Sequence, residues 1–168
     1  MKKFELTTEF ITNMFGKKLF RIKALVEFGN VKAGELGGYV EKEENVSQDG
    51  NAWVSGDARV YGDAEVSGDA WVSGNAWVYG NARVSGNARV SSDADYALVQ
   101  GFGTEFRCTT FYRGKNKKIM VNCGCFHGDL EEFRKQVKET RSGKIAKEYL
   151  MIADLMKYHF ASEDSSDE

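Results

Sequence analysis

The residues in this sequence best suited to chemistry are three cysteines and a histidine in its last third. Cys123, Cys125 and His127 alternate along one segment, so their side chains would share one face of a strand, with Cys108 opposite them on a partner strand. Four such ligands can bind zinc tetrahedrally. However, the C-x-C spacing departs from the usual structural zinc signature, and free cysteine is an ordinary buried hydrophobe. We therefore expect core packing, no cofactor and no metal, with zinc as the alternative.

A second chemical candidate is a basic segment that surrounds Phe111 and Tyr112. Cationic side chains could contact phosphates while an aromatic ring stacks on a base. The isoelectric point is acidic, at about 5.8, and hairpin tips are commonly charged, so we favour a solvated tip over a nucleic-acid partner. The basic residues are Arg107, Arg113, Lys115, Lys117 and Lys118.

The elements that position these residues follow from a six-residue repeat. Seven units run without a slip, from Val54-Ser-Gly-Asp-Ala-Arg59 to Val90-Ser-Ser-Asp-Ala-Asp95. Alanine and valine stand two residues apart, so both face the same side of a strand, and the Gly-Asn or Gly-Asp pair tolerates a tight bend. Each unit is predicted to form one short strand and one corner, and stacked units would share a continuous core.

The outward-facing residues indicate how many units complete one coil. Tyr61 and Tyr79 are 18 residues apart, as are Trp53 and Trp71, which corresponds to three units. This spacing predicts a triangular prism in which each coil rises by about 4.8 Å. Like positions would stack in three columns: Trp53, Trp71 and Arg89; Arg59, Trp77 and Asp95; Glu65 and Arg83.

The repeat resembles the hexapeptide-repeat proteins of the left-handed parallel β-helix class, in which an aliphatic residue is followed four positions later by a small one, as in Val54 and Ala58. This resemblance implies the left hand of the coil. The class includes acyltransferases, which need a histidine base near the coils, and γ-class carbonic anhydrases, which need three histidines. Only His127 and His159 occur, both outside the repeat. We therefore expect a non-enzymatic protein with no catalytic residues.

The flanking segments lack the repeat and complete a mainly β chain. Residues 1–45 are predicted to form an N-terminal β cap, because a coil without a neighbour exposes its interior. Residues 46–100 are predicted to form a short parallel β-helix of 18-residue coils, left-handed as the resemblance implies. Residues 101–161 form a β-hairpin followed by two helices, the first capped by Asp129 with Glu132. The acidic tail, residues 162–168, is expected to be disordered.

Charge and composition favour a soluble cytoplasmic protein with no membrane partner. No apolar stretch approaches the length of a membrane span, and three clustered cysteines argue against a secreted disulfide framework. The net charge of −2 conceals a segregation. Residues 46–95 carry seven acidic and three basic side chains, a net −4, whereas residues 96–161 carry twelve basic and seven acidic, a net +5.

The order of the motifs resembles uncharacterised hexapeptide-repeat proteins common in phages and prophages. A Lys-Phe-Glu-Leu opening, a Gly-Glu-Leu-Gly-Gly-Tyr-Val segment, the Asn-Ala-Trp-Val repeats and a closing Asn-Cys-Gly-Cys-Phe carry this resemblance. It implies a phage accessory protein in the host cytoplasm.

The strand alternation also forces large aromatic rings outward, where they form a partner or oligomer surface. Something is expected to cover them: the chain's own C-terminal helices, a second copy in a dimer or trimer, or a host protein. Our hypothesis is an inhibitor of a host defence protein, such as a CRISPR effector, that binds and occludes it as a homo-oligomer. The alternative is an enzyme or a binder of a nucleotide or acyl-CoA with its site between subunits. The rings are Trp53, Tyr61, Trp71, Trp77 and Tyr79.

Overall fold

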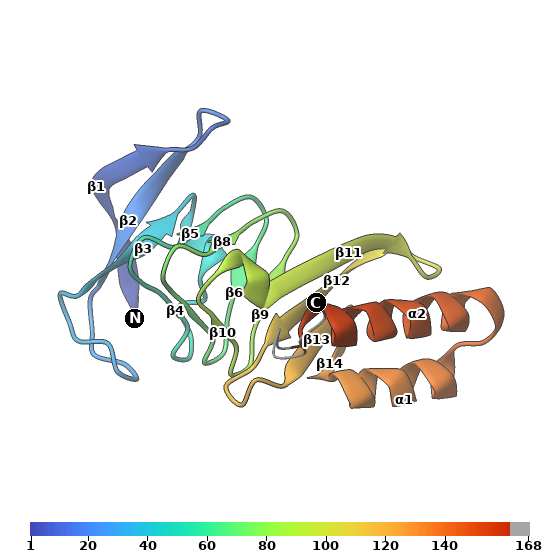
Figure 1. The fold of residues 1–168 in the computed structure, drawn as a ribbon. Coiled ribbons are helices and arrows are strands. Elements are labelled where there is room, and N and C mark those ends of the chain that lie inside the picture. The colour runs from blue at the N-terminus through green and yellow to red at the C-terminus, as the bar shows by residue number, and fades with distance from the viewer. Residues whose placement is uncertain (162–168) are drawn as a thin grey trace, which may run out of the picture.

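Residues 1–161 are described by the computed structural model, so the predicted disordered tail at 162–168 lies outside the described residues. Three parts follow one another along an elongated molecule: an N-terminal sheet, a stack of short coils, and a C-terminal sheet with two helices (Figure 1).

The coils are built from two-residue strands, one in each repeat unit. Strands 18 residues apart pair in parallel and in register, so Trp53 pairs with Trp71, Arg59 with Trp77, and Glu65 with Arg83. This pairing confirms the predicted three units per coil. The strands are β4 (Trp53–Val54), β5 (Arg59–Val60), β6 (Glu65–Val66), β7 (Trp71–Val72), β8 (Trp77–Val78), β9 (Arg83–Val84) and β10 (Arg89–Val90).

Valine and alanine fill the interior of the prism, as the alternation predicts. Every valine from Val54 to Val90 and every alanine from Ala52 to Ala88 in the repeat is buried, and each valine contributes about 1.5–3 kcal/mol relative to exposure. The last unit departs from this pattern. Asp93–Asp95 forms a short 3-10 helix and Ala94 is exposed, so the prediction that Asp95 extends the Arg59 column is wrong.

Glycine at the corners allows successive coils to stack closely. Gly68 has a φ of +64°, and a Cβ placed there would lie 2.9 Å from the backbone nitrogen of Gly86 in the next coil. The same corner carries a hydrogen bond in which the amide of Asp69 donates to the carbonyl of Gly86 at 2.8 Å. A side chain at this position would force the corners apart.

The N-terminal cap is a hairpin whose sheet runs on into one face of the prism. Strands β1 (Phe4–Thr12) and β2 (Lys18–Ala24) are antiparallel, β2 pairs with β3 (Leu36–Val40), and β3 pairs in parallel with β5. Sheet order is therefore β1-β2-β3-β5-β8. After β3, the short 3-10 helix η1 (Glu43–Asn45) leads to Val46, which bridges to Val66 in the first coil.

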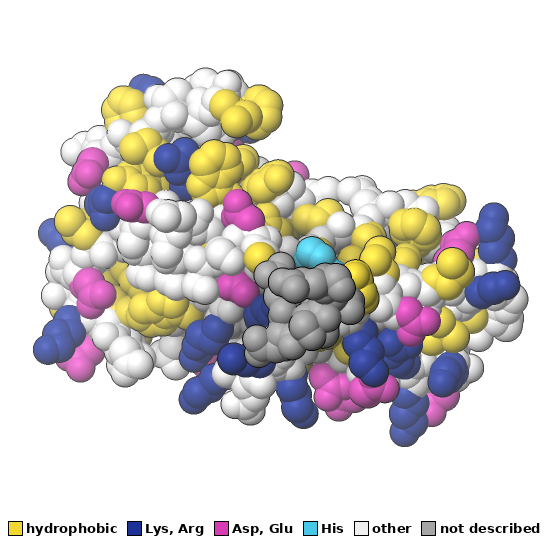
Figure 2. Space-filling model, in the orientation of Figure 1, with side chains coloured by type: hydrophobic (Ala, Val, Ile, Leu, Met, Phe, Trp, Pro, Cys, Tyr) yellow, Lys and Arg dark blue, Asp and Glu magenta, His cyan; other side chains and the backbone are white. Residues whose placement is uncertain are grey.

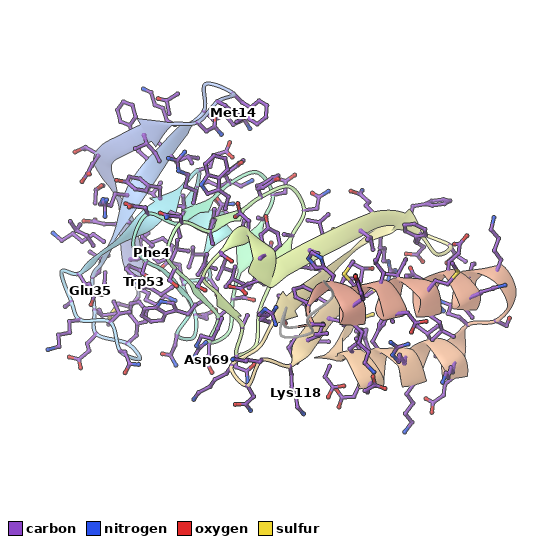
Figure 3. The ribbon with its side chains drawn as sticks, in the orientation of Figure 1. Phe4, Met14, Glu35, Trp53, Asp69 and Lys118 are labelled. Carbon is purple, nitrogen blue, oxygen red and sulfur yellow. The ribbon has the colours of Figure 1, made fainter. Side chains whose placement is uncertain are left out.

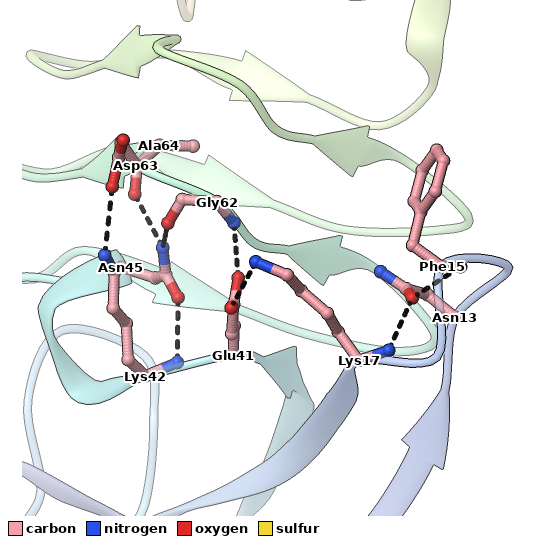
Figure 4. A network of polar contacts seen from close by, with 9 residues as sticks. All are labelled: Asn13, Phe15, Lys17, Glu41, Lys42, Asn45, Gly62, Asp63 and Ala64. Carbon is pink, nitrogen blue, oxygen red and sulfur yellow. Dashed lines mark hydrogen bonds and ion pairs between the residues drawn. The ribbon is translucent and has the colours of Figure 1, made fainter.

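A network of polar contacts fastens the cap to a corner of the first coil (Figure 4). The buried amide of Asn45 donates to the carbonyl oxygens of Gly62 and Ala64, at 3.1 and 2.8 Å. Burial opposes the charge of Glu41, but the amide of Gly62 and the ammonium of Lys17 outweigh it and lower the pKa of this carboxyl. These contacts satisfy groups that the open end of the coil would otherwise leave unpaired.

Lys3 also connects the cap to the coils, and its burial makes its contribution to stability depend on pH. Its ammonium donates to the carbonyls of Gly50 and Ala52 and lies 4.6 Å from the centroid of the Phe28 ring. Burial lowers the pKa of Lys3 from 10.5 to about 8. In the window between these values the unfolded chain binds more protons at this site than the folded chain does. Raising the pH through it therefore increases the stability contribution of Lys3.

We expect the stability difference between the parent chain and Lys3→Met to shift in favour of the parent between about pH 7 and about pH 9.5. Urea unfolding of both proteins at the two pH values measures this shift, since other titrating groups are common to both. A difference that stays constant, or that moves toward the variant, would show that the buried ammonium is not destabilised.

The C-terminal module contains more strands than the sequence predicts. The predicted hairpin is present as β12 (Arg107–Arg113) and β13 (Ile119–Cys123), but β11 (Tyr96–Phe102) and β14 (Phe126–Asp129) complete an antiparallel sheet of order β11-β12-β13-β14. The predicted boundary at residue 100 is therefore wrong, because β11 belongs to this sheet and the coils end at Val90. The residues of β11 follow the last repeat directly, so the repeat pattern alone groups them with the coils.

Two helices cover one face of this sheet. Helix α1 (Leu130–Thr140) has the predicted cap, with the amide of Glu132 donating to the carboxylate of Asp129 at 2.9 Å. Helix α2 (Gly143–His159) follows. Phe111, Val121, Phe133 and Tyr149 belong to the core between sheet and helices. No helix of residues 1–161 combines the length and apolar character needed to cross a membrane.

The opposite face of the sheet closes the last coil with side chains and a bridge. Thr110 accepts from the amide of Arg83 at 3.0 Å, and Asn122 donates to the carbonyl of Arg83 at 2.9 Å. On another face of the prism, Gly114 forms an isolated bridge with Ala88. The final coil therefore does not present an open strand edge.

Candidate interaction surface

Arginine and aromatic side chains alternate across the outer face of the sheet that joins cap and coils. The paired strands bring Arg21 beside Tyr39, Tyr39 beside Arg59, and Arg59 beside Trp77. The guanidinium of Arg21 lies 4.5 Å from the Tyr39 ring centroid and that of Arg59 lies 4.9 Å from the Trp77 ring. A cation over a ring is a favourable contact, so each pair stabilises the orientation of both of its side chains.

Beside this ladder, a cluster of rings that we call the aromatic corner borders one side of a groove of about 390 Å³. It comprises Tyr61, Trp77, Tyr79 and Tyr96. The rings of Tyr61 and Tyr79 stack with centroids 5.2 Å apart and planes within 7°. The groove is lined by Tyr79, Asp93, Tyr96 and the start of β11, and Tyr79 is 48% exposed. The corner therefore offers a preformed aromatic wall at the edge of an open groove.

The corner also has a defined polarity. Burial, together with the Tyr79 phenol, raises the pKa of Tyr61, and burial with the charge of Asp93 also raises that of Tyr96. The Tyr96 hydroxyl donates to the carbonyl of Trp77, and the amide of Trp77 donates to Asp93 at 2.7 Å. The phenols of Tyr61 and Tyr79 can donate to polar groups of a partner and stack with it, while the carboxylate of Asp93 favours a cationic group nearby.

Two of the predicted surface tryptophans lie elsewhere. The prediction that Trp53 is exposed is wrong, because the cap covers it completely: the rings of Phe4 and Phe28 pack against it at centroid distances of 6.2 and 5.3 Å. Figure 3 shows Phe4 and Trp53 beside each other at the N-terminal end. Trp71 is half-buried on a different face of the prism, and its indole donates to Ser55 at 3.1 Å.

The four residues of the zinc alternative do not come together. A turn formed by Gly124 and Cys125 separates β13 from β14, so Cys123 pairs with Phe126 and Asn122 with His127. This turn resets the alternation: Cys123 joins the helix-side core, while His127 meets the Tyr112 hydroxyl near the coils at 2.9 Å. Burial raises the pKa of the Cys108 thiol. Within the described chain, no three side chains of metal-ligand type gather in one place.

The predicted basic surface is divided between the two ends of β12. Arg107 starts this strand and Arg113 ends it, about 20 Å apart for a seven-residue strand. The guanidinium of Arg113 forms an ion pair with the carboxylate of Asp95 at 3.0 Å. Phe111 and Tyr112 are buried, so neither ring is available to stack on a base, as the less favoured nucleic-acid alternative would require. The remaining cations, Lys115, Lys117 and Lys118, are exposed at the β12–β13 turn.

A cleft with a volume of about 640 Å³ lies between the coils and the C-terminal sheet. Arg83 and Glu65 line one wall and Arg107, Cys108 and Asn122 the other. Phe106, 65% exposed at its rim, has a φ of +53°, which is uncommon for a residue with a side chain. The coil wall carries charges of both signs and the opposite wall a positive charge, so this is a polar cleft rather than an apolar pocket.

Several residues of the surface were missed in the sequence. Tyr96 stands six residues after Val90, at the inward-facing valine position of the repeat, so the columns of outward residues do not include it. Arg21 and Tyr39 belong to the cap, and only the cross-strand register places them beside Arg59. The 18-residue separation of Arg59 and Trp77 is enough to predict that these two residues lie side by side.

Comparison with known proteins supports the repeat architecture. A family model described as the YdcK beta solenoid repeat matches residues 82–94, which contain β9 and β10. No curated protein matches the chain. The match covers about two repeat units, and its similarity to a β-solenoid repeat agrees with the pairing of strands 18 residues apart.

Proposed function

We propose that this chain is a non-enzymatic interaction protein and that the aromatic corner is the surface that binds its partner. The observation that carries the proposal is the parallel Tyr61–Tyr79 stack, with Tyr79 half exposed beside an open groove. Tyrosine and tryptophan dominate the residues that contribute most to protein–protein binding. The stack and the cation-bearing ladder beside it are already ordered, so a partner would not have to immobilise them.

We also propose where this binding takes place and what it does. By resemblance, the coil is left-handed and of the hexapeptide-repeat type, and the chain is a phage or prophage protein that acts in the host cytoplasm. Its role is to occlude a host defence protein, such as a CRISPR effector, as a homo-oligomer. The Tyr96 side of the groove includes Asp93, which favours a partner segment that carries arginine or lysine.

Truncation of Tyr79 tests the surface. In Tyr79→Ala, partner binding is expected to weaken by about tenfold to a hundredfold, because an exposed ring at the centre of an interface is lost. Phe15→Ala removes a ring that is 73% exposed at the tip of the β1–β2 hairpin, and it should leave affinity unchanged. Calorimetric titration against purified CRISPR effectors, with nuclease inhibition as a second readout, measures both. Absence of binding and inhibition across the panel would remove the defence role, and unchanged affinity in Tyr79→Ala would remove the corner.

The second candidate is a small-ligand binder, and the polar cleft beside β12 favours it. Arg83 and Arg107 could contact an anionic group such as a phosphate, and the exposed Phe106 ring could stack on a base. The protein would then be an enzyme, or a binder of a nucleotide or acyl-CoA, whose site is completed between subunits. A thermal-shift panel of these compounds distinguishes it, because a true ligand raises the melting temperature by mass action.

A further inference from the structure

Two thiols of the C-terminal module line one small pocket. The turn between β13 and β14 consists of Gly124 and Cys125, so Cys123 and Cys125 lie on either side of a glycine where the chain reverses. Both cysteines line a pocket of about 120 Å³ beside α1, and Cys123 also lines a second pocket of about 70 Å³. Cys125 is exposed and Cys123 is half-buried. The pair is therefore accessible to small molecules in the solvent.

Two hydroxyl groups are placed to donate to the Cys123 sulfur. The Thr109 hydroxyl donates to it at 3.1 Å, across the pairing of β12 with β13. Burial raises the pKa of the Tyr149 phenol on α2, and a negative charge on the neighbouring Cys123 sulfur raises it further. Both Thr109 and Tyr149 are buried. Hydroxyl donors stabilise negative charge on sulfur, and the thiolate is the nucleophilic form of cysteine.

Two guanidinium groups border the same pockets. Arg107 lies against the turn, because a Cβ placed on Gly124 would collide with its Nη1. Its other terminal nitrogen, Nη2, donates to Glu105. Arg141 lines both pockets and belongs to the connection between α1 and α2, at the end of the molecule farthest from the N-terminal hairpin (Figure 1). Figure 2 shows Lys and Arg side chains at this end. Cations beside a thiol favour the nucleophilic thiolate.

We propose that Cys123 and Cys125 form a peroxide-reactive dithiol site, in which Cys123 is the nucleophile and Cys125 is the resolving thiol. The Cys123 thiolate attacks one oxygen of hydrogen peroxide, so that an S–O bond forms and the O–O bond breaks. The departing hydroxide takes up the proton that the thiol lost and leaves as water. The Cys125 thiolate then attacks the sulfenic sulfur, which forms the S–S bond and releases a second water in the same way. Two thiols are oxidised to a disulfide, and one peroxide is reduced to two waters.

The size of the pockets favours a peroxide as the oxidant. Sites for drug-sized ligands have volumes of about 300–1,000 Å³, whereas the two pockets that Cys123 lines have about 120 and 70 Å³. Hydrogen peroxide has only two heavy atoms, so it can reach the sulfur where a larger disulfide or thioester cannot. This site is separate from the aromatic corner and does not depend on partner binding.

The chain geometry allows the second step. Two residues span at most about 7 Å even when fully extended, and a turn brings their Cα atoms closer. A disulfide requires a Cα separation below about 7 Å. Gly124, with a φ of +60°, allows this tight turn between the two thiols. The remaining thiol, Cys108, neighbours Thr109 on β12 and so points to the opposite face of the sheet, and burial raises its pKa.

Oxidation of the reduced full chain with hydrogen peroxide tests the proposal. Cleavage by trypsin after Lys118 and Arg134 gives one peptide that contains both Cys123 and Cys125, separate from the peptide with Cys108. We expect the first peptide to lose two hydrogen atoms at least about tenfold faster than Cys108 is oxidised. In Cys125→Ser, a sulfenic acid should persist on Cys123 and be trapped by dimedone. In Cys123→Ser, the rapid oxidation of this peptide should disappear.

Variants of the surrounding groups test how Cys123 is activated. Thr109→Val removes a hydroxyl donor and should slow the oxidation of Cys123 by about tenfold, whereas Thr109→Ser keeps the hydroxyl and should react like the parent chain. Arg107→Gln, at an exposed position, should slow it by about threefold to tenfold. Circular dichroism verifies the fold of each variant.

Three results would overturn the proposal. They are equal oxidation rates at Cys123 and Cys108, a disulfide that contains Cys108, and a parental rate in both Thr109→Val and Arg107→Gln. Partner binding by the aromatic corner can be measured on Cys123→Ser, so the dithiol site and the interaction surface can fail separately.

Discussion

Replacing Trp53 with alanine is expected to lower the free energy of unfolding by about 3–5 kcal/mol, one of the two largest effects that we predict for a substitution in this chain. Trp53 is 0% exposed and joins the cap to the coils through its edge contacts with Phe4 and Phe28. Its removal leaves a cavity that three different segments line, and the short strand β4 cannot move inward to fill it because the next coil is paired to it.

Two matched variants separate this cavity from the general effect of removing a tryptophan. Trp77→Ala should cost only about 1 kcal/mol, since the ring is half-buried on the outer face and mainly loses its contact with Arg59. Trp53→Phe should cost less than Trp53→Ala, because it keeps a ring and removes an indole N–H that has no acceptor among the described residues. Urea unfolding measures all three, and equal costs for Trp53→Ala and Trp77→Ala would contradict the covered position of Trp53.

Gly37→Ala is expected to destabilise the junction between cap and coils by about 3 kcal/mol or more, through overpacking. A Cβ at this position would lie 2.5 Å from the carbonyl oxygen of Val54, 2.6 Å from the side chain of Ile22 and 2.7 Å from the Trp53 ring. None of these neighbours can withdraw easily, because one is backbone and the other two are buried core side chains.

The control is Gly80→Ala, at a corner of the coils. Gly80 has a φ of +68° but open space around its Cβ position, so alanine there costs only backbone strain, about 1 kcal/mol. Thermal and urea unfolding of the two variants should therefore differ by about 2 kcal/mol or more. If Gly80→Ala proved as costly as Gly37→Ala, strain rather than close packing would govern the glycines of this chain.

The coil could be predicted because every repeat unit has the same pattern of apolar residues. Alanine and valine must face inward in each unit, and Tyr61 with Tyr79 sets the period, so a single error could not have changed the result. The burial of Trp53 could not be predicted in this way. Its covering rings, Phe4 and Phe28, come from a segment with no repeat, and only the register of the cap brings them to the first coil.

The candidate sites at the C-terminal end failed for a local reason. The interpretation of Cys123, Cys125 and His127 as one face assumed an unbroken strand, but a tight turn lies in the middle of this segment. Cys-Gly-Cys does not signal a turn as clearly as Asn-Gly does. In contrast, Asp129 and Glu132 form the predicted cap, because both sides of that interaction lie within one helical turn.

The way in which the cap and the C-terminal sheet attach to the coils determines how the number of coils in this protein can change. The cap pairs with the first coil and the C-terminal sheet is hydrogen-bonded to the last one, and the three-sided cross-section of the coils recurs every 18 residues. Inserting or deleting one full lap would therefore return the same three strands to each end. The distance between the hairpin and the helices would change in steps of about 4.8 Å, so the stack serves as an adjustable spacer whose length can evolve without redesign of either terminus.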